Sequence, residues 1–241
     1  MTTPSTAPRA HRTARERARA ELTGEIVACA RRQLAEHGAA ALSLRAIARD
    51  LGMVSSALYR YFPSRDALLT RLIIEAYDGL GAAAEDAEAP VGRTDLRGRF
   101  TATCRAVRRW ALDHPHEYAL IYGSPVPGYR APADTIGPAT RVAAVFVAIL
   151  VDGVRDGSIL APHGTLDQDV ATAMQPVMTF FPAELAPEVA LGGLQSFSAL
   201  FGAVSFELFG QLHNVVDEDP ELRDAFFNAE VDSLATLVGI T

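Results

Sequence analysis

The chain contains no lysine, and all 22 of its basic residues are arginine. Cysteine is nearly as scarce. Cys29 and Cys104 are the only two, and they lie far apart in sequence with no metal-ligand spacing around them. Their separation and helical context disfavour both a disulfide framework and a metal site, so we expect both thiols to be packed inside helices.

Long apolar runs are also lacking. The longest uninterrupted one, residues 142–151, is about half of the roughly 20 residues that a membrane-spanning helix requires. The N-terminus is polar and rich in arginine, without the apolar core of a secretory signal. We therefore expect a soluble, cytoplasmic protein with no membrane partner.

Charge is distributed unevenly along the 241 residues. The net charge is −7, yet residues 1–65 carry eleven arginines against five acidic residues, a net +6, while the remainder carries eleven arginines against 24 acidic residues, a net −13. A basic head on an acidic body suits a protein whose one end must meet phosphate while the rest avoids it. The apolar content of 49% is enough for a real core and excludes disorder throughout.

Persistent strand alternation is absent, and apolar residues recur at three- and four-residue spacing, which predicts an all-α fold. A first helix is predicted from Thr23 to His37, and two short helices around Gly52 form a helix-turn-helix. Ser64 is expected to cap a fourth, connecting helix that fades near residues 79–81. Further helices are predicted at residues 94–113, 115–122, 134–156, 166–180, 187–212 and 219–238.

The clearest compositional break is the acidic, alanine-rich stretch at residues 84–92, and we place the domain boundary near it. The expected organisation is an arginine-rich leader over residues 1–19, a helix-turn-helix domain over residues 20–80 with its motif at 43–62, and a larger helical domain over residues 93–241.

Residues 42–69, LSLRAIARDLGMVSSALYRYFPSRDALL, closely resemble the DNA-binding head of TetR-type transcriptional regulators. The resemblance implies a three-helix head with a fourth connecting helix, followed by a helical domain that dimerises and encloses an effector cavity. At one position the chain departs from the family, because Val54 stands where Ser or Thr is usual. We expect Ser55 or Ser56 to replace the missing cap and to shift the helix start. The residues that carry the resemblance are Ser43, Arg45, Ala48, Leu51, Gly52, Ala57, Leu58, Tyr59, Tyr61, Phe62, Pro63, Ser64 and Arg65.

The same residues make physical sense as a DNA-reading surface. Apolar side chains at Ile47, Leu51, Leu58 and Phe62 are expected to fix the angle of the second short helix, whose small exposed residues permit close approach to a major groove. Arg45 is the best candidate for a guanine contact, worth about 1 to 3 kcal/mol of discrimination if bidentate. The full predicted set is Arg45, Ser55, Ser56, Ala57, Tyr59, Arg60, Tyr61 and Arg65, of which Tyr59, Tyr61 and Arg65 resemble phosphate-gripping positions.

Two alternatives stand beside this reading of the basic residues. Arg45, Arg49 and Arg60 could form only the solvated face of a small helical bundle. The leader, with arginines at positions 9, 12, 15, 17 and 19, is either an arm that enters an adjacent minor groove or a solvated, partly helical segment that adds nonspecific phosphate attraction.

The body resembles the C-terminal regulatory domain of one TetR subgroup over residues 105–125, RAVRRWALDHPHEYALIYGSP. This resemblance implies an effector cavity, and the aromatic and methionine side chains of the body suit a small apolar or aromatic effector of unknown identity. The same aromatic and methionine side chains would serve equally as a dry core. The candidate pocket residues are Trp110, Tyr118, Phe146, Met174, Met178, Phe181 and Phe201.

No metal or other cofactor and no catalytic residue are expected. Pro115 breaks the helix between His114 and His116, so these histidines and Glu117 are not held on one face as metal ligands. No nucleophile elbow or phosphate-cradling glycine loop appears, and Gly192-Gly193 lacks the strand that a dinucleotide site demands, so an enzyme is not expected.

The last two long helices are the predicted dimer surface. Two apolar or small-residue stripes lie on the first of them and one on the second, and together they could close a four-helix bundle across a twofold axis, or serve only the core of one subunit. The stripes are Leu194, Phe197, Phe201, Val204 and Leu208; Gly193, Ser196, Leu200 and Ala203; and Phe227, Val231, Leu234 and Val238.

Together these features predict a homodimeric, ligand-responsive regulator that binds a palindromic operator in double-stranded DNA and is released by its effector, with the fourth helix as the lever. Activation of transcription is the alternative of the same family. A small-molecule-binding protein or enzyme with a vestigial head, and a nonspecific architectural DNA protein, are alternatives from other classes.

Overall fold

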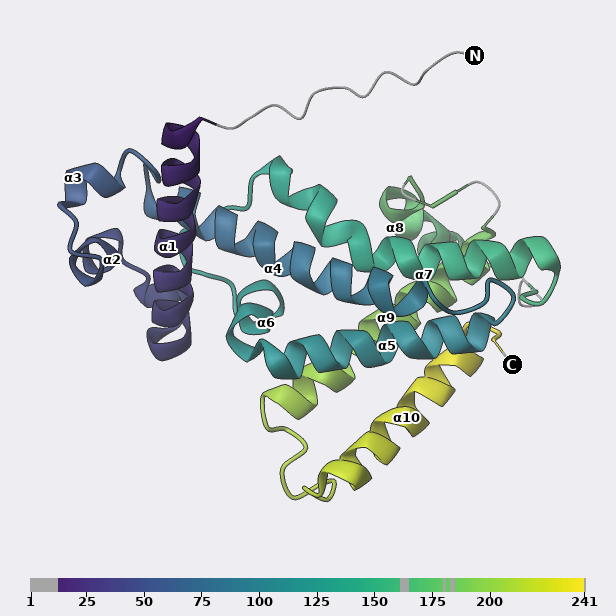
Figure 1. Cartoon of the computed structure of the whole chain (residues 1–241). Helices are drawn as coiled ribbons and strands as arrows, with labels where there is room; N and C mark the ends of the chain where they lie inside the picture. Colours follow the sequence, from purple (N-terminus) through teal and green to yellow (C-terminus); the bar gives the residue numbers. More distant parts are fainter. Residues whose placement is uncertain (1–12, 161–164, 180, 183–184, 241) are drawn as a thin grey trace, which may run out of the picture. The chain divides into compact units, whose positions relative to one another are not determined.

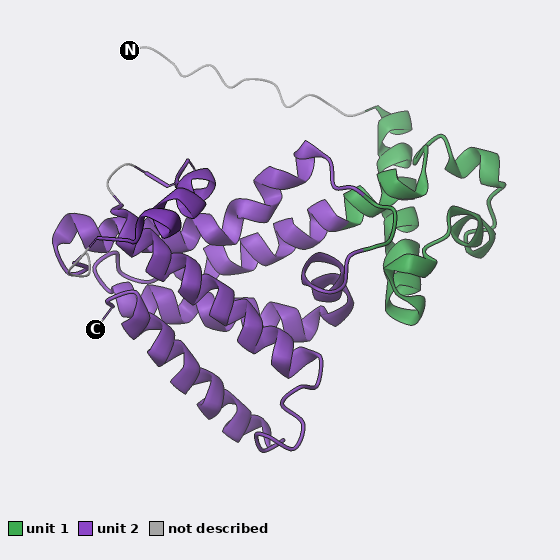
Figure 2. Cartoon of the chain, turned by 180° about the vertical axis from the view of Figure 1, so that it is seen from behind, with its two compact units in different colours: residues 1–72, 126–129 green, residues 73–125, 130–241 purple. Residues whose placement is uncertain are grey.

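The structure is a computed structural model that describes residues 13–160, 165–179, 181–182 and 185–240. Within these ranges the chain forms ten α-helices and two short 3-10 helices, with no strand, so the predicted all-α fold is confirmed (Figure 1). The chain divides into two compact units (Figure 2). The first unit comprises residues 1–72 and 126–129, and the second comprises residues 73–125 and 130–241.

The first unit is a small bundle whose elements follow one another closely along the chain. Its core is formed by apolar residues with almost no solvent exposure, among them Ile26, Leu34, Ile47, Leu58 and Leu68. The elements are α1 (Ala14–His37), η1 (Ala39–Ala41), α2 (Leu44–Asp50), α3 (Ser55–Leu58) and the first two turns of α4 (Arg65–Glu88).

Helix α1 begins nine residues earlier than predicted, at Ala14 instead of Thr23. A reciprocal capping box explains the start: the Glu16 backbone N–H donates to Thr13 Oγ1, and the Thr13 backbone N–H donates to the Glu16 carboxylate. The apolar period that guided the prediction marks only the part of α1 that is buried, because the first buried residue is Ile26.

Helix α4 does not fade at residues 79–81 as predicted but continues to Glu88. Gly79 and Gly81 allow close packing instead of ending the helix. A Cβ added at Gly81 would lie 2.6 Å from Cβ of Arg141 on α7, and one at Gly79 would lie 3.2 Å from Trp110 Nε1 on α5. The buried stripe Ala76, Leu80 and Ala84 runs through this stretch, so α4 is one continuous helix shared by the two units.

The second unit packs α5, α7, α9 and α10 around a common core, with α6 against α5 and α8 against α9. The predicted helices are all present, although the predicted 187–212 helix ends at Leu208 and the predicted 166–180 helix runs only from Gln168 to Met178. Cys104 is fully buried here and Cys29 is buried in the first unit, as packed thiols. The elements are α5 (Leu96–Asp113), α6 (Pro115–Tyr122), η2 (Ala133–Thr135), α7 (Ile136–Asp156), α8 (Gln168–Met178), α9 (Pro187–Leu208) and α10 (Pro220–Leu237).

Two helical stretches, Ala133–Asp156 and Pro187–Leu208, are long and apolar enough to cross a membrane by length and composition alone. Core helices of water-soluble proteins pass the same test. Val142, Phe146 and Ile149 of α7 are buried in the shared core, and α7 packs against α5 and α9. The packing accounts for the buried part of the apolar surface of α7, 39% of its most apolar stretch.

Candidate nucleic-acid interface

Helix α2 starts at a capped N-terminus that leaves Arg45 in solvent. The Ser43 hydroxyl accepts a hydrogen bond of 3.4 Å from the Ala46 backbone N–H. Leu44, Ile47 and Ala48 are buried, whereas Arg45 and Arg49 are exposed on the opposite side. The packing of α2 therefore dictates that Arg45 points away from the core, and its guanidinium is available for a ligand.

A buried glutamine that the sequence analysis did not identify fixes both ends of α2. Gln33 of α1 is 8% exposed. Its Nε2 donates to Asp50 Oδ2 at 3.3 Å, and its Oε1 accepts from the Ser43 backbone N–H at 3.4 Å. One side chain thus bridges the residue that caps α2 and the residue that ends it. A polar residue at a buried position of the α1 period was the only signal in the sequence.

The turn between α2 and α3 requires glycine. Gly52 has φ = +64°, a left-handed conformation that other residues adopt only with strain. The Gly52 backbone N–H donates to the Arg49 carbonyl at 3.1 Å, and the Met53 backbone N–H donates to the Ala48 carbonyl at 2.8 Å. This pair of bonds is the Schellman motif, which satisfies the last carbonyls of α2 and sets the direction in which α3 leaves.

Helix α3 starts at Ser55, directly after Val54, which occupies the N-cap without a side-chain hydrogen bond. The predicted replacement of the cap by Ser55 or Ser56, with a shifted helix start, is therefore wrong. Ser55 and Ser56 are exposed and Ala57 is half-buried, while Leu58 is fully buried. Because Leu58 packs into the core, the hydroxyls of Ser55 and Ser56 lie on the exposed side of α3.

The residues after α3 are placed in different ways. Tyr59 and Arg60 are exposed, whereas Tyr61 is half-buried. The Arg19 guanidinium of α1 lies over the Tyr61 ring, 5.4 Å from its centroid. Arg65 is half-buried, and its guanidinium donates to the backbone carbonyls of Ala39, Ala40 and Leu42 at 2.8 to 3.2 Å, just before α2. These three bonds engage the Arg65 guanidinium with the segment that leads into α2.

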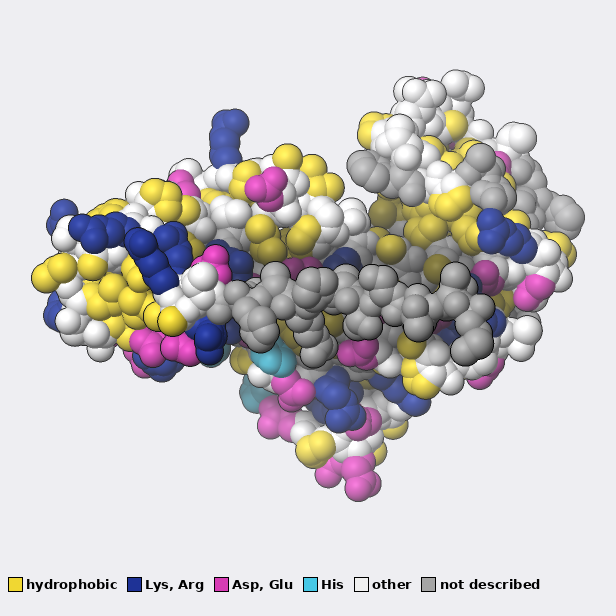
Figure 3. All heavy atoms as spheres, turned by 45° about the horizontal axis from the view of Figure 1, so that its top comes forward, with side chains coloured by type: hydrophobic (Ala, Val, Ile, Leu, Met, Phe, Trp, Pro, Cys, Tyr) yellow, Lys and Arg dark blue, Asp and Glu magenta, His cyan; other side chains and the backbone are white. Residues whose placement is uncertain are grey.

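The surface of the first unit is rich in arginine. On the face drawn in Figure 3, several arginine side chains gather over this unit, beside a smaller group of acidic side chains. Arg45, Arg49 and Arg60 contribute exposed guanidiniums from the helix-turn-helix. A surface of this kind attracts a polyanion along its length.

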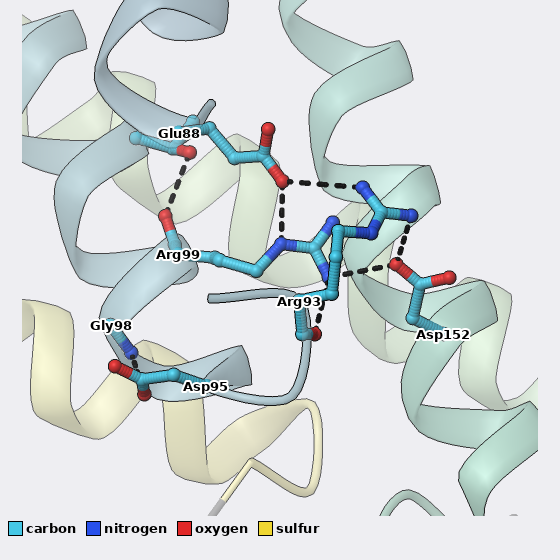
Figure 4. Close-up of polar contacts among 7 residues, drawn as sticks. Glu88, Arg93, Asp95, Gly98, Arg99 and Asp152 are labelled. Carbon is cyan, nitrogen blue, oxygen red and sulfur yellow. Dashed lines mark hydrogen bonds and ion pairs between the residues drawn. The ribbon is translucent and has the colours of Figure 1, made fainter. Parts of the chain in front are cut away.

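In the second unit, four charged residues form a cluster at the C-terminal end of α4 (Figure 4). Arg99 of α5 is fully buried, and it donates to Glu88 Oε1 at 2.5 Å and to Asp152 Oδ2 of α7 at 2.7 Å. Arg93 also pairs with Asp152. Two arginines and two carboxylates balance one another, as a buried charge requires. The cluster ties the last residue of α4 to α5 and α7.

A second ion-pair group connects α7 to α4 at Glu85 and Asp78, which precede Glu88 by 3 and 10 residues. Arg141 donates to the Glu85 carboxylate at 2.6 and 2.9 Å and to Asp78, on both its side chain and its backbone carbonyl, at 2.9 Å. Hydrogen bonding by Arg141 lowers the pKa of the Glu85 carboxyl. The second half of α4 is therefore held along its length by charged groups of neighbouring helices.

The predicted pocket residues lie mostly in the core. Trp110, Tyr118, Phe146 and Phe201 are buried members of the shared core of the second unit, and Phe181 packs against that core half-buried. The Tyr118 hydroxyl donates to the Phe201 carbonyl at 3.2 Å and lies 2.9 Å from Ser205 Oγ. Burial raises the pKa of Tyr118, so this hydroxyl stays neutral. Met174 is buried on α8 and Met178 is half-buried.

A cavity of about 450 Å³ lies between α4 and α5 and is bounded by one of the predicted pocket residues. Its apolar wall comes from Trp110 and from alanines at positions 83, 87, 102 and 106. Its polar lining contains two arginines, two aspartates and a histidine: Arg105, Arg109, Asp86, Asp113 and His114. The His114 ring stacks on Trp110 with centroids 4.9 Å apart, and His114 Nδ1 lies 3.0 Å from the Trp110 carbonyl oxygen. Among the described residues, no group of three or more His, Cys, Asp or Glu side chains could hold a metal ion.

Two family models match the chain. Residues 26–72 match the model for bacterial regulatory proteins of the tetR family, and residues 100–234 match the model for the tetracyclin repressor-like C-terminal domain. The first match contains the whole helix-turn-helix, and the second covers more than half of the chain.

Curated relatives and solved structures agree with these models. The chain is 41% identical over 207 residues to the HTH-type transcriptional regulator Rv1816 of Mycobacterium tuberculosis, a match that covers 86% of this chain and 88% of the relative. The crystal structure of the regulatory protein SCO4313 is 37% identical, with a TM-score of 0.71 over 93% of this chain and all of the other. The regulator PfmR of Thermus thermophilus, 22% identical with a TM-score of 0.56 over 87% of this chain and 96% of its own, shares the fold.

Proposed function

Because this chain belongs to the TetR family of bacterial transcriptional regulators, we propose that it is a homodimeric repressor that leaves a palindromic operator when a small apolar or aromatic molecule binds to its second unit. The observation that carries the DNA-binding part of the proposal is the presentation of Arg45. Its helix is capped by Ser43, fixed at both ends by Gln33 and turned into α3 at Gly52.

The proposed readers of sequence are Arg45 and the exposed hydroxyls of Ser55 and Ser56. Arginine can donate two parallel bonds to a guanine edge in the major groove, and short side chains let α3 approach the bases closely. Exposed Tyr59 and Arg60 are proposed to hold phosphates, which sets register without reading sequence. Arg65, engaged with backbone carbonyls before α2, is proposed to act indirectly by holding that segment in place.

Regulators of this family form dimers, and α9 and α10 are the proposed dimer surface of this chain. The stripes expected from the sequence are largely used inside the subunit, since Phe201, Val204, Leu200, Phe227 and Val231 are buried in the core. A different row of residues on each helix, which on α9 shares only Leu194 with the expected stripes, is exposed or half-exposed instead. On α9 it contains Leu194, Ser198, Gly202 and Phe206, and on α10 it contains Leu222, Phe226, Ala229, Ser233 and Leu237.

The exposed stripes suit helix-to-helix contact. Phe206 is 56% exposed and Leu222 is 52% exposed, which leaves large apolar side chains in water in the monomer. A Cβ built at Gly202 meets no atom within 4 Å, so the middle of the α9 stripe is open to a partner helix. Two such helices from each subunit would form a four-helix bundle across a twofold axis. The two heads would then meet major grooves about 34 to 36 Å apart.

The proposed effector site is the α4–α5 cavity beside Trp110. An aromatic ring would pack against Trp110 and the alanine wall, and the charged lining would meet polar groups of the ligand. The site lies on the second half of α4, and the same helix continues into the first unit. A ligand that binds more tightly to one tilt of α4 increases the fraction of molecules with that tilt, and with it the fraction whose heads fit DNA changes. A ligand with equal affinity for both tilts would change neither fraction.

The proposal is tested by selecting bound duplexes from a random DNA pool with the purified full-length protein and then titrating the winner with salt. Recovery of an inverted repeat, with affinity well above that for random DNA, supports a dimeric operator-binding regulator. An enriched single half-site would contradict the dimer, and no enrichment at all would contradict sequence-specific binding. A steep salt dependence without sequence preference would indicate a nonspecific DNA protein. A reporter gene behind the recovered repeat then separates repression from activation.

The recovered operator also serves as the probe for effectors. A library of small aromatic and apolar compounds is screened for release of the labelled duplex. Ala106→Trp fills the α4–α5 cavity and is expected to abolish release while leaving operator binding intact. Leu160→Trp, an exposed site on the loop after α7 that does not line this cavity, is the control. Release that survives Ala106→Trp contradicts the assignment of this cavity.

A further inference from the structure

Helix α1 extends well beyond the core that it serves. Residues 14–21 are all exposed, and burial begins with half-buried Leu22 and Thr23 and is complete at Ile26, so about two turns of helix precede the part that packs in the first unit. These turns also lie before the segment that matches the tetR family model, which begins at residue 26. Packing against the core does not explain why the chain stays helical from Ala14 onward, and exposed helices of this length are only marginally stable in water.

The extension and the turn after it carry three exposed arginines together with three acidic residues, Glu16, Glu21 and Glu25. Arg15, Arg17 and Arg19 are all exposed, although the Arg19 guanidinium also contacts an aromatic ring. A cation in the first turn of a helix opposes the helix dipole, so Arg15 does not serve the stability of α1 through the dipole. Glu16, the nearest acid, is engaged by the Thr13 backbone in the capping box. An external anion would remove the conflict.

The position of the extension within the first unit indicates which anion this is. The Arg19 guanidinium lies over the Tyr61 ring, just after α3. Arg15 lies one turn earlier and therefore on the same side of α1 as Arg19. A guanidinium stacked on an aromatic ring keeps the edge with its N–H donors open to a phosphate. The side of the extension that carries Arg15 and Arg19 thus adjoins the residues directly after α3, the helix that is proposed to enter the major groove.

We propose that Arg15 and Arg19, with Arg19 positioned by Tyr61, form a phosphate clamp that binds the DNA backbone at the edge of the groove occupied by α3. The clamp increases the affinity and lengthens the stretch of DNA that the protein contacts. It reads no base, because both side chains reach phosphate only. It rests on the proposed function in one respect, since it needs the helix-turn-helix to be docked on DNA. Residues 1–12 of the leader, with Arg9 and Arg12, lie outside the described residues and are not part of it.

The test compares full-length Arg15→Gln/Arg19→Gln with Arg97→Gln/Arg155→Gln, which removes the same charge from the second unit. The affinity for the selected operator and for a random duplex of equal length is measured over a series of salt concentrations. In the clamp variant, both affinities are expected to fall by a similar factor. The slope of log K against log salt is expected to decrease by about 0.9 for each lost phosphate contact, about 1.8 for two. The control is expected to retain the slope of the wild type.

A conservative variant separates phosphate binding from a merely structural role. Arg15→Lys/Arg19→Lys keeps both charges and is expected to recover most of the salt slope. The proposal is overturned if the lysine variant loses as much slope as the glutamine variant, if the glutamine variant keeps the slope of the wild type, or if its loss is confined to the operator and spares random DNA. If instead the wild type shows no preference for any duplex, the proposed function fails, a result distinct from failure of the clamp.

Discussion

Gln33 Nε2 on α1 donates a hydrogen bond to Asp50 Oδ2 at the last residue of α2, 3.3 Å away, while the other end of the same amide accepts from the Ser43 backbone. A single buried side chain therefore contacts both ends of α2, the helix that carries Arg45. The first prediction concerns this bridge. Gln33→Ala leaves the Ser43 backbone N–H and Asp50 without this partner. It is expected to lower the free energy of unfolding by about 1 to 3 kcal/mol.

The same substitution is expected to weaken operator binding by more than the loss of folded protein explains, because α2 loses its alignment. Urea unfolding and operator titration measure the two effects. Glu36→Ala, an exposed change one turn along α1, is the control and should leave both values nearly unchanged. Equal effects of the two variants would show that the bridge does not position α2.

The second prediction concerns the turn glycine. Gly52→Ala places a Cβ at φ = +64° and is expected to destabilise the protein by about 1 to 2 kcal/mol. Gly24→Ala lies in the interior of α1, where an added Cβ meets nothing within 4 Å, and it should stabilise by about 0.5 to 1 kcal/mol. If urea unfolding shows that Gly52→Ala lowers the free energy of unfolding and Gly24→Ala raises it, the difference comes from the backbone conformation at the two positions. A neutral Gly52→Ala would contradict it.

Arg45 gives the third prediction. Arg45→Ala is expected to cost about 1 to 3 kcal/mol of operator affinity and to relax the preference at one base position in each half-site. Arg49→Ala removes the same charge one turn later on α2 and should weaken binding to all sequences alike, or not at all. Selection from the random pool with each variant distinguishes them. If Arg45→Ala yields the same sequence preference as the wild type, Arg45 reads no base.

The buried charge cluster leads to the fourth prediction. Glu88→Ala removes one of two carboxylates beside the fully buried Arg99, which keeps Asp152, and is expected to lower the free energy of unfolding by about 1 to 3 kcal/mol. Asp232→Ala breaks an ion pair with Arg97 that is exposed on both sides, so its cost should not exceed about 1 kcal/mol. Thermal and urea unfolding are the measurements. Comparable losses in the two variants would contradict the role given to burial.

The fifth prediction concerns the dimer. Gly202→Gln fits the open surface of α9 in one subunit but would hold a partner helix away, so it is expected to raise the monomer fraction strongly. Gly137→Gln, at a similarly open glycine near the start of α7, is the matched control and should remain dimeric. Sedimentation at several protein concentrations measures the effect. An unchanged dimer in Gly202→Gln would exclude this face of α9.

Several features of the fold were determined by local sequence. Capping and turn residues act on their immediate neighbours, which is why Ser43, Gly52 and Ser64 predicted the starts and the turn of the helix-turn-helix and the structure places them there. The resemblance to TetR-type regulators rests on the same short segment, and the family match confirms it. Most helix positions in the second unit also follow from the period of their apolar residues.

What the tertiary structure alone decided concerns contacts between segments far apart in sequence. Gly79 and Gly81 read as helix ends, yet they accommodate Trp110 and Arg141, which lie 31 and 60 residues further along the chain. The apolar period of α9 cannot tell a face buried in its own subunit from one left open, because both satisfy the same helical spacing. Gln33, Arg65 and the Arg99 cluster acquire their roles only when the polar groups that they satisfy are brought beside them. Local spacing fixes which face a residue occupies, and only packing fixes what that face meets.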